Sequence, residues 1–209
     1  GPYSLQLSGL TAGSDYYYKA FARNSVGTAY ASSGRRFYVH SASSPRIELS
    51  STSTTGAFPI GNTVGVNNTA YTISYDNAII YKYDVSNKSA PTLLGSATTT
   101  SQPGYIITEG NYAYVSTYTG NILTYSITAS TSPVLQNTYT YGVGYGLGNM
   151  HVLDGYLYVT ATKSGAGKIV ILDISSPAQP SFLSEISVGT TGGGDMQKRG
   201  SYLYYADYI

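Results

Sequence analysis

The stretch Lys168–Phe182, KIVILDISSPAQPSF, decides the fold. It begins with an apolar run, Ile169–Leu172, continues into Asp-Ile-Ser and reaches a proline at Pro180. Related stretches precede it at Ile79–Pro91 (IIYKYDVSNKSAP) and Asn121–Pro133 (NILTYSITASTSP). A short apolar run that ends in turn-forming residues predicts a β-strand followed by a turn. We therefore expect one strand–turn unit to be used at least three times.

Two independent markers give the period of this repeat. Asp84, Ser126 and Asp173 occupy one position and are separated by 42 and 47 residues. A glycine followed ten residues later by a tyrosine recurs with offsets of 43, 44 and 46 residues. Its four copies are Gly61–Tyr71, Gly104–Tyr114, Gly148–Tyr158 and Gly194–Tyr204. Self-similarity at this period is typical of propeller blades or solenoid turns, and repeats that are all β favour the propeller.

Each repeat predicts four antiparallel strands. The innermost strand follows the marker glycine, a tyrosine-rich strand comes second, the apolar run is third and a weaker outer strand follows the proline. The expected second strands are Ala70–Ser74, Tyr112–Thr117, Tyr156–Thr160 and Tyr202–Ala206. The expected third strands are Ile79–Val85, Ile122–Ile127 and Lys168–Ile174, with Phe182–Val188 as an outer strand. The predicted fold is thus all-β, with about three and a half propeller blades over residues 61–209, incomplete at the C-terminus and without a helix longer than one turn.

Three segments of the repeat resemble a known family. They are GNYAYVS (Gly110–Ser116), DGYLYVT (Asp154–Thr160) and KIVILDISSPAQPSFLSEI (Lys168–Ile186). They look like the LVIVD repeat of bacterial and archaeal cell-surface propellers, although Ser126 stands where that family usually has Asp. The resemblance implies a β-propeller and an extracellular or cell-surface location in a prokaryote, and it implies no particular reaction.

The first forty residues differ from the repeats. Tyr3–Tyr30, YSLQLSGLTAGSDYYYKAFARNSVGTAY, resembles the second half of a fibronectin type III domain. Leu10 and Tyr16 have the spacing of the tyrosine corner of that fold, in which the hydroxyl bonds the backbone just upstream. Alternating residues predict one strand over 16–23 and a returning strand over 28–38. The expected domains are a partial fibronectin type III-like β-sandwich (residues 1–40), a Ser/Thr-rich linker (41–60) and the propeller (61–209).

Composition limits the possible partners. Charged residues make up 10% of the chain, against roughly 25% in ordinary soluble domains. The net charge of +1 provides no field that would attract nucleic acid or an anionic membrane. The chain has 24 tyrosines and no cysteine, so disulfides and thiolate chemistry are excluded. No apolar run is long enough to predict a membrane span. This composition suits an exported β-protein.

The sequence predicts no catalytic residue, metal site or cofactor. Asp84 and Asp173 recur at a repeat position, which indicates turn capping by side-chain hydrogen bonds to the backbone. The only histidines, His40 and His151, are isolated and predict no zinc site. The glycine-rich segments at 142–148 and 192–194 precede no predicted helix, so close approach of backbone near the propeller axis explains them better than phosphate binding.

The candidate ligand-binding residues follow the marker glycines. Asn62, Tyr105, Asn149 and Asp195 each come one residue after the glycine, and His151 comes three residues after it in its repeat. Residues two apart on a strand share a face, so one such set should look toward the central channel. Any small ligand should lie against Asn149 and Asp195. The alternative is that these side chains merely hydrate the channel wall.

Tyrosines outside the strands offer a second kind of binding surface. Tyr139, Tyr141 and Tyr145 are expected in loops or blade junctions, where exposed rings could stack on sugars or on protein groups. For packing, we expect Val159, Tyr158, Ile169 and Ile171 to lie between blades, and Ile171→Asp to unfold the protein.

Three functions remain open at this stage. The first is a non-enzymatic surface protein for adhesion or assembly, which binds proteins or glycans. The second is an extracellular enzyme with the propeller as its catalytic or substrate-binding domain. The third is a subunit of a surface filament or layer that neighbouring chains complete. Convergent carboxylates in a polar cleft would favour the enzyme, and strand exchange between chains would favour the filament.

Overall fold

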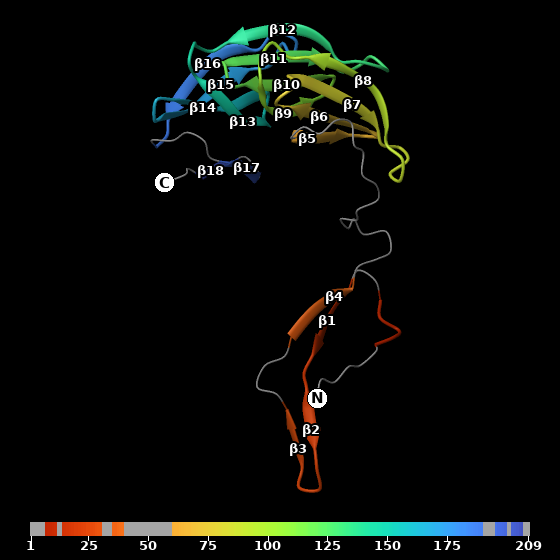
Figure 1. Ribbon diagram of the computed structural model, residues 1–209. Helices are drawn as coiled ribbons and strands as arrows, with labels where there is room; N and C mark the ends of the chain where they lie inside the picture. The colour runs from red at the N-terminus through yellow and green to blue at the C-terminus, as the bar shows by residue number, and fades with distance from the viewer. Residues whose placement is uncertain are drawn as a thin grey trace. The chain divides into compact units, whose positions relative to one another are not determined.

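The computed structural model describes residues 7–11, 14–30, 35–39, 60–189, 195–199 and 202–206. The chain divides into two compact units, residues 1–49 and 50–209. Every regular element in the described residues is a β-strand (Figure 1). The predicted all-β class is therefore confirmed for this part of the chain. The expected linker lies almost wholly outside the described residues, as does His40.

In its described residues the first unit contains four short strands: β1 (Ser14–Tyr18), β2 (Phe21–Arg23), β3 (Thr28–Tyr30) and β4 (Arg35–Val39). β1 pairs with β4 and β2 pairs with β3, both antiparallel. The strand predicted over 16–23 is broken at residues 19–20, and the strand predicted over 28–38 contains β3 and β4, with residues 31–34 between them outside the described part. Between the pairs Tyr18–Arg35 and Phe21–Tyr30 there are two residues on one side and four on the other, so a single register cannot continue.

The Tyr16 hydroxyl accepts a hydrogen bond from the Thr11 backbone N–H at 2.7 Å. This bond joins the start of β1 to the segment just upstream, as the spacing of Leu10 and Tyr16 predicted. It restrains the turn before β1 because it fixes a side chain of the strand to the backbone of the turn.

The second unit contains three four-stranded antiparallel sheets and one further pair of strands in its described residues. The sheets have the orders β5-β6-β7-β8, β9-β10-β11-β12 and β13-β14-β15-β16, and β17 pairs with β18. Their bounds are β5 (Ile60–Val66), β6 (Thr69–Ser74), β7 (Ile79–Asp84), β8 (Thr92–Thr98), β9 (Pro103–Glu109), β10 (Tyr112–Thr117), β11 (Asn121–Ser126), β12 (Val134–Thr140), β13 (Gly146–Leu153), β14 (Tyr156–Lys163), β15 (Ala166–Asp173), β16 (Ser181–Ser187), β17 (Asp195–Arg199) and β18 (Tyr202–Ala206).

The sheets are arranged as propeller blades. Each is a meander in which neighbouring strands follow one another in the sequence. The first strands of successive sheets lie next to each other in the order β5, β9, β13, β17, and the later strands extend outward from them (Figure 1). This is the four-stranded unit that the repeat period predicted.

The first strand of each complete sheet is interrupted at its marker glycine. The pairing register shifts between Ile60 and Thr63 in β5, at Gly104 in β9 and between Leu147 and Met150 in β13. Such β-bulges bend a strand and redirect its side chains. A Cβ added at Gly104 would stand 2.7 Å from the Leu147 carbonyl oxygen. These two inner strands therefore approach closely at Gly104. Within the glycine-rich segment itself, a Cβ at Gly148 would instead meet the Thr160 hydroxyl at 2.9 Å, and residues 192–194 lie outside the described part.

Two apolar cores fill the spaces between neighbouring blades. The first core joins the sheets β5–β8 and β9–β12, and its members include Tyr71, Ile73, Val115 and Leu123. The second core joins the sheets β9–β12 and β13–β16; its buried members are Tyr114, Ile122, Leu147, Met150, Leu157, Val159, Ala161, Val170, Leu172 and Ile174. The middle sheet is thus covered by apolar side chains on both faces, and residues 113–115 of β10 and 122–123 of β11 are buried in succession.

The packing prediction for the third blade is only partly correct. Val159 and Ile169 are buried, but Tyr158 and Ile171 are half-buried. Tyr158 and Ile171 face each other across β14 and β15. Because side chains alternate between the two faces of a strand, they lie on the face opposite the core that Val159 and Val170 join. Val170, and not Ile171, is therefore the residue whose replacement by Asp should unfold this unit.

The two repeated aspartates cap turns, as predicted. Asp84 Oδ1 accepts a hydrogen bond from the Ser86 N–H at 2.8 Å, and Asp173 Oδ1 accepts one from the Ser175 N–H at 2.7 Å. These backbone hydrogen bonds hold the pKa of both carboxyl groups below its usual range. Ser126 takes the same place in the second blade and bonds the Thr128 hydroxyl instead, at 3.0 Å.

Buried tyrosine hydroxyls link the middle blade to both neighbours. The Tyr114 hydroxyl donates to the Pro177 carbonyl at 2.9 Å, and the Tyr125 hydroxyl donates to the Thr98 carbonyl at 2.7 Å. Burial raises the pKa of each tyrosine to about 12, and for Tyr114 the nearby Glu109 adds to the effect. The neutral phenol is thus the form that the folded state prefers.

We expect the second unit to lose stability at alkaline pH through these tyrosines. A tyrosine whose folded pKa exceeds its unfolded value contributes stability that is complete below about pH 10 and is lost as the pH rises toward about 12. Urea unfolding at pH 8 and pH 11 measures this loss. Tyr114→Phe should lower stability at pH 8 by about 1 kcal/mol and reduce the pH-dependent loss. The exposed Tyr202→Phe is the control and should change neither quantity; an unchanged pH dependence in Tyr114→Phe contradicts the assignment.

Candidate functional site

The bulges at the marker glycines bring four predicted residues together. Asn62, Tyr105, Asn149 and Asp195 lie on the inner strands β5, β9, β13 and β17. Asn62 Oδ1 accepts the Ile106 N–H at 3.0 Å, which ties β5 to β9 beside Tyr105. The Asn149 side-chain amide donates to Asp195 Oδ1, which ties β13 to β17. We call these four residues the inner-strand cluster.

Tyr105 connects the two halves of this cluster electrostatically. Burial raises the pKa of the Tyr105 phenol, the negative charge of Asp195 raises it further, and a hydrogen bond with Asn62 partly opposes the change. A Coulombic effect of Asp195 on Tyr105 requires the two groups to be near each other. The cluster therefore contains a phenol, two amides and a carboxylate, which suit hydrogen bonding to a polar ligand.

Asn149 has an unused acceptor. Its Oδ1 atom is buried and has no hydrogen-bond partner in the part of the chain that the structure describes. Asp195 Oδ1, in contrast, also accepts the Met196 N–H at 2.9 Å. A buried acceptor without a partner costs about 1–3 kcal/mol, so a ligand that donates to Asn149 would recover part of this cost.

A cavity of about 360 Å³ lies beside the cluster and shares Asn149 with it. Its lining consists of Tyr118, the β13 residues 146–149 and two β14 threonines, Thr160 and Thr162. This volume is at the lower end of the range for small-molecule sites. Tyr118 is half exposed, and its ring meets the Tyr75 ring edge-on at 5.4 Å between centroids. The cavity thus combines one aromatic surface with hydroxyl and amide groups.

His151 does not belong to the cluster. It lies on β13 two residues beyond Asn149, is half-buried and pairs across the sheet with Tyr158. Among the described residues, no hydrogen bond connects His151 with Asn149 or Asp195. His151 lies on the inner strand β13, as predicted, but in the described part of the chain the structure shows no polar contact between its side chain and the other candidate residues.

Tyr141 and Tyr145 lie in the connection between β12 and β13, as predicted, but their rings and that of Tyr139 are half-buried rather than exposed. Tyr139 is part of strand β12, and Tyr139, Tyr141 and Tyr145 all pack against the second core. Neighbouring blades cover these rings because the connection from β12 to β13 passes over the core. The rings of Tyr141 and Tyr145 meet edge-on, 4.8 Å apart.

A charged network surrounds Tyr141, and sequence reasoning missed it. The Tyr141 hydroxyl donates to Glu185 Oε2 at 2.5 Å, and Lys168 forms an ion pair with Glu185 Oε1. Hydrogen bonds from Lys168 and Tyr141 lower the pKa of Glu185. Burial and Glu185 together raise the pKa of Tyr141. Glu185 and Tyr141 are 44 residues apart in sequence and lie on different elements, so the pattern of the sequence could not reveal their contact.

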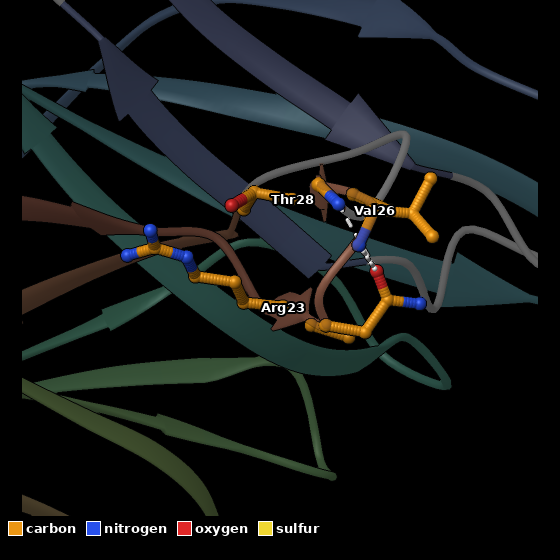
Figure 2. A pocket seen from close by; sticks show the side chains of 7 residues that line it. Arg23, Val26 and Thr28 are labelled. Atoms are coloured by element: carbon orange, nitrogen blue, oxygen red, sulfur yellow. Dashed lines mark hydrogen bonds between the residues drawn. The ribbon is translucent and has the colours of Figure 1, made fainter.

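The first unit has a hollow of about 330 Å³ at its hairpin turn, between β2 and β3 (Figure 2). Asn24 Oδ1 accepts the N–H groups of Val26 and Gly27 at 2.9 and 3.0 Å, as the dashed lines in Figure 2 show. The residues that line the hollow are all exposed, and Arg23 is the charged one among them. The hollow is the concave side of an ordinary turn and offers no enclosed surface.

Among the described residues, no group of three or more His, Asp or Glu side chains is placed to hold a metal ion. No helix in this part of the chain is long and apolar enough to cross a membrane.

The LVIVD repeat family matches residues 82–99 and 148–187. The chain carries LVIVD repeats. These repeats and the four-stranded meanders agree with a β-propeller. No curated protein matches the sequence of the chain.

Solved structures with the same fold are similar at low sequence identity. A Bacteroides uniformis protein, provisionally named a 6-phosphogluconolactonase, is 16% identical with a TM-score of 0.62, over 94% of this chain and 62% of that one. The periplasmic gluconolactonase PpgL of Pseudomonas aeruginosa is 15% identical with a TM-score of 0.53, over 62% and 41%. The computationally designed Ika4 protein is 11% identical with a TM-score of 0.57, over 74% and 88%. At these identities the similarity shows the fold alone, and the chain spans only about two fifths of the length of the gluconolactonase.

Proposed function

We propose that this chain is part of an extracellular or cell-surface propeller protein that binds a polar ligand, a glycan or a protein surface, without catalysis. The observation that carries the proposal is the convergence of four inner-strand residues beside a cavity, with Asn149 common to both. Their equivalent places in the repeat put them on successive strands. The LVIVD repeats and the periplasmic location named for one structural neighbour support a location outside the cytoplasm.

The chemistry of the site suits a hydroxylated ligand. The amide of Asn149 and the carboxylate of Asp195 provide a donor and acceptors, and the buried Oδ1 of Asn149 can accept one more hydrogen bond. Tyr118 contributes an aromatic surface of the kind that stacks on sugar rings. A few directed polar groups around an apolar surface are typical of small-molecule sites.

We further propose that residues 1–40 form the second half of a fibronectin type III-like module, joined by residues 41–60 to about three and a half blades. The hydrogen bond from the Thr11 N–H to the Tyr16 hydroxyl supports this assignment.

Alanine at Asn149 and Asp195 tests the binding site. We expect the double variant to lose at least tenfold in affinity for whichever members of a glycan panel the parent binds, because two directed hydrogen bonds are removed. Far-UV circular dichroism and the melting temperature must stay close to those of the parent. Gln136→Ala is the control, since Gln136 is exposed on the outer strand β12 and lines neither cavity. Unchanged binding in a folded double variant would remove the inner-strand cluster as the binding site.

The same experiment can also support one of two other functions, an enzyme or a subunit of a surface filament or layer. The two lactonase neighbours favour a hydrolase, so release of acid from a sugar lactone by the parent, with no binding to glycans, would support an enzyme. Exposed apolar pairs recur near the start of the outer strands β8, β12 and β16: Leu93–Leu94, Val134–Leu135 and Phe182–Leu183. Exposed apolar surface marks contact sites. Self-association of the parent without glycan binding would therefore support the filament or layer.

A further inference from the structure

A second cavity, of about 320 Å³, lies between the sheets β5–β8 and β9–β12. Its buried wall contains Tyr71, Lys82 and Ile127, and its exposed rim includes Asn111 and Ser130. The sheet that contributes Lys82 and the loop between β11 and β12 close it from two sides. It shares no residue with the cavity beside Asn149.

Lys82 is unusual because it is a buried cation. Its side chain is only 5% exposed. Its ammonium donates to the Ala129 carbonyl and lies 5.7 Å from the centre of the Tyr71 ring. Among the described residues no carboxylate pairs with it, and burial lowers its pKa. An ammonium has three donors, and burying it without a counterion costs several kcal/mol.

The fold does not need this charge. Thr124 and Ile171 occupy the equivalent place in the second and third blades, counted from the repeated Asp84, Ser126 and Asp173. In the next blade interface, a tyrosine hydroxyl makes the corresponding bond, from Tyr114 to Pro177. The second and third blades are therefore linked by a neutral hydroxyl, whereas Lys82 links the first and second blades through a charged ammonium. A residue that breaks the local rule of an otherwise regular repeat is best explained by function.

We propose that this cavity binds a small oxyanion, a carboxylate or a phosphate, with the Lys82 ammonium as its counterion. The residues that line the cavity include hydroxyl and amide groups at the rim and no carboxylate, so nothing in the lining repels an anion. The cavity volume is sufficient for a molecule the size of citrate. An anion at Lys82 would replace the missing counterion and use donors that the protein leaves unfilled.

Thermal melts of the full chain test the proposal, with inorganic phosphate and citrate as probes and chloride at matched ionic strength as the reference. A probe at ten times its Kd should raise the Tm of the parent by about 3–6 °C over chloride. Lys82→Gln should remove this rise. Lys88→Gln takes the same charge from the exposed β7–β8 loop and should respond like the parent.

Ser130 provides a test that leaves the core intact. Ser130→Asp places a carboxylate at the exposed rim, where it competes for Lys82, and should abolish the response; Ser130→Asn should retain it. If Lys82→Gln does not fold, the comparison of Ser130→Asp with Ser130→Asn still tests whether an anion binds at Lys82. A response to phosphate alone or to citrate alone identifies the ligand class. The proposal is overturned if neither probe stabilises the parent, or if Lys82→Gln or Ser130→Asp responds as the parent does.

Discussion

Val170→Asp is expected to unfold the second unit, or to lower its free energy of unfolding by about 3–5 kcal/mol, because it places an unpaired carboxylate in the core between two blades. Val170 is fully buried and pairs across the sheet with Val159, which is also fully buried. Their neighbours in this core are apolar side chains from both sheets, Tyr114 and Leu157 among them. A loss of this size is a large part of the total stability of an ordinary domain.

Ile171→Asp is the matched control for this prediction. Ile171 is the next residue of β15, but it is half-buried on the opposite face, across from Tyr158. Water can reach an aspartate there, so we expect a loss of about 1–2 kcal/mol. Urea unfolding followed by circular dichroism measures both variants. Equal losses for the two substitutions would show that the faces of β15 have been assigned wrongly.

The contrast between Val170 and Ile171 shows where sequence reasoning ended. The run Ile169–Leu172 is apolar at every position, and its pattern correctly predicted a β-strand. It could not show which face meets the preceding blade, because that depends on how complete sheets pack. The expected burial of Ile171 was therefore wrong, whereas that of Val159 was correct.

Two of the tyrosine-rich second strands were predicted with their observed bounds. Tyr112–Thr117 and Tyr202–Ala206 have the bounds that the sequence predicted. The strand expected over residues 16–23 failed, because its break depends on unequal spacing in the partner strand. The periodicity of side chains is read from one segment of sequence, whereas the ends of a strand also depend on the register with its partner strand.

The candidate site was predictable in position but not in detail. Counting from the marker glycines places Asn149 and Asp195 on successive inner strands, and the structure brings the two into contact. Nothing in the sequence revealed the β-bulges that direct these side chains, or the unused acceptor of Asn149. Lys82 was missed because a single lysine in an apolar strand resembles a solvent-exposed position until the neighbouring blade is in place.

Gly120→Ala is expected to be the second most destabilising change, with a loss of about 3 kcal/mol. Gly120 lies in the β10–β11 turn with a φ of +84°, a conformation that side chains disfavour by about 1–2 kcal/mol. A Cβ there would also press deep into the Gly142 carbonyl oxygen, in the connection between β12 and β13. Backbone cannot swing aside as a flexible side chain can, so the turn or the connection must shift, at a further cost of about 1–3 kcal/mol.

Gly110→Ala separates these two contributions. Gly110 lies in the β9–β10 turn with a φ of +55°, and a Cβ there meets nothing within 4 Å. It should therefore lose only the conformational part, about 1–2 kcal/mol. The difference between the two variants in urea unfolding measures the close approach of the β10–β11 turn to the β12–β13 connection, which leads into the cavity beside Asn149. If Gly120→Ala loses no more than Gly110→Ala, that approach is looser than the structure has it, and the wall of the cavity is not held from this side.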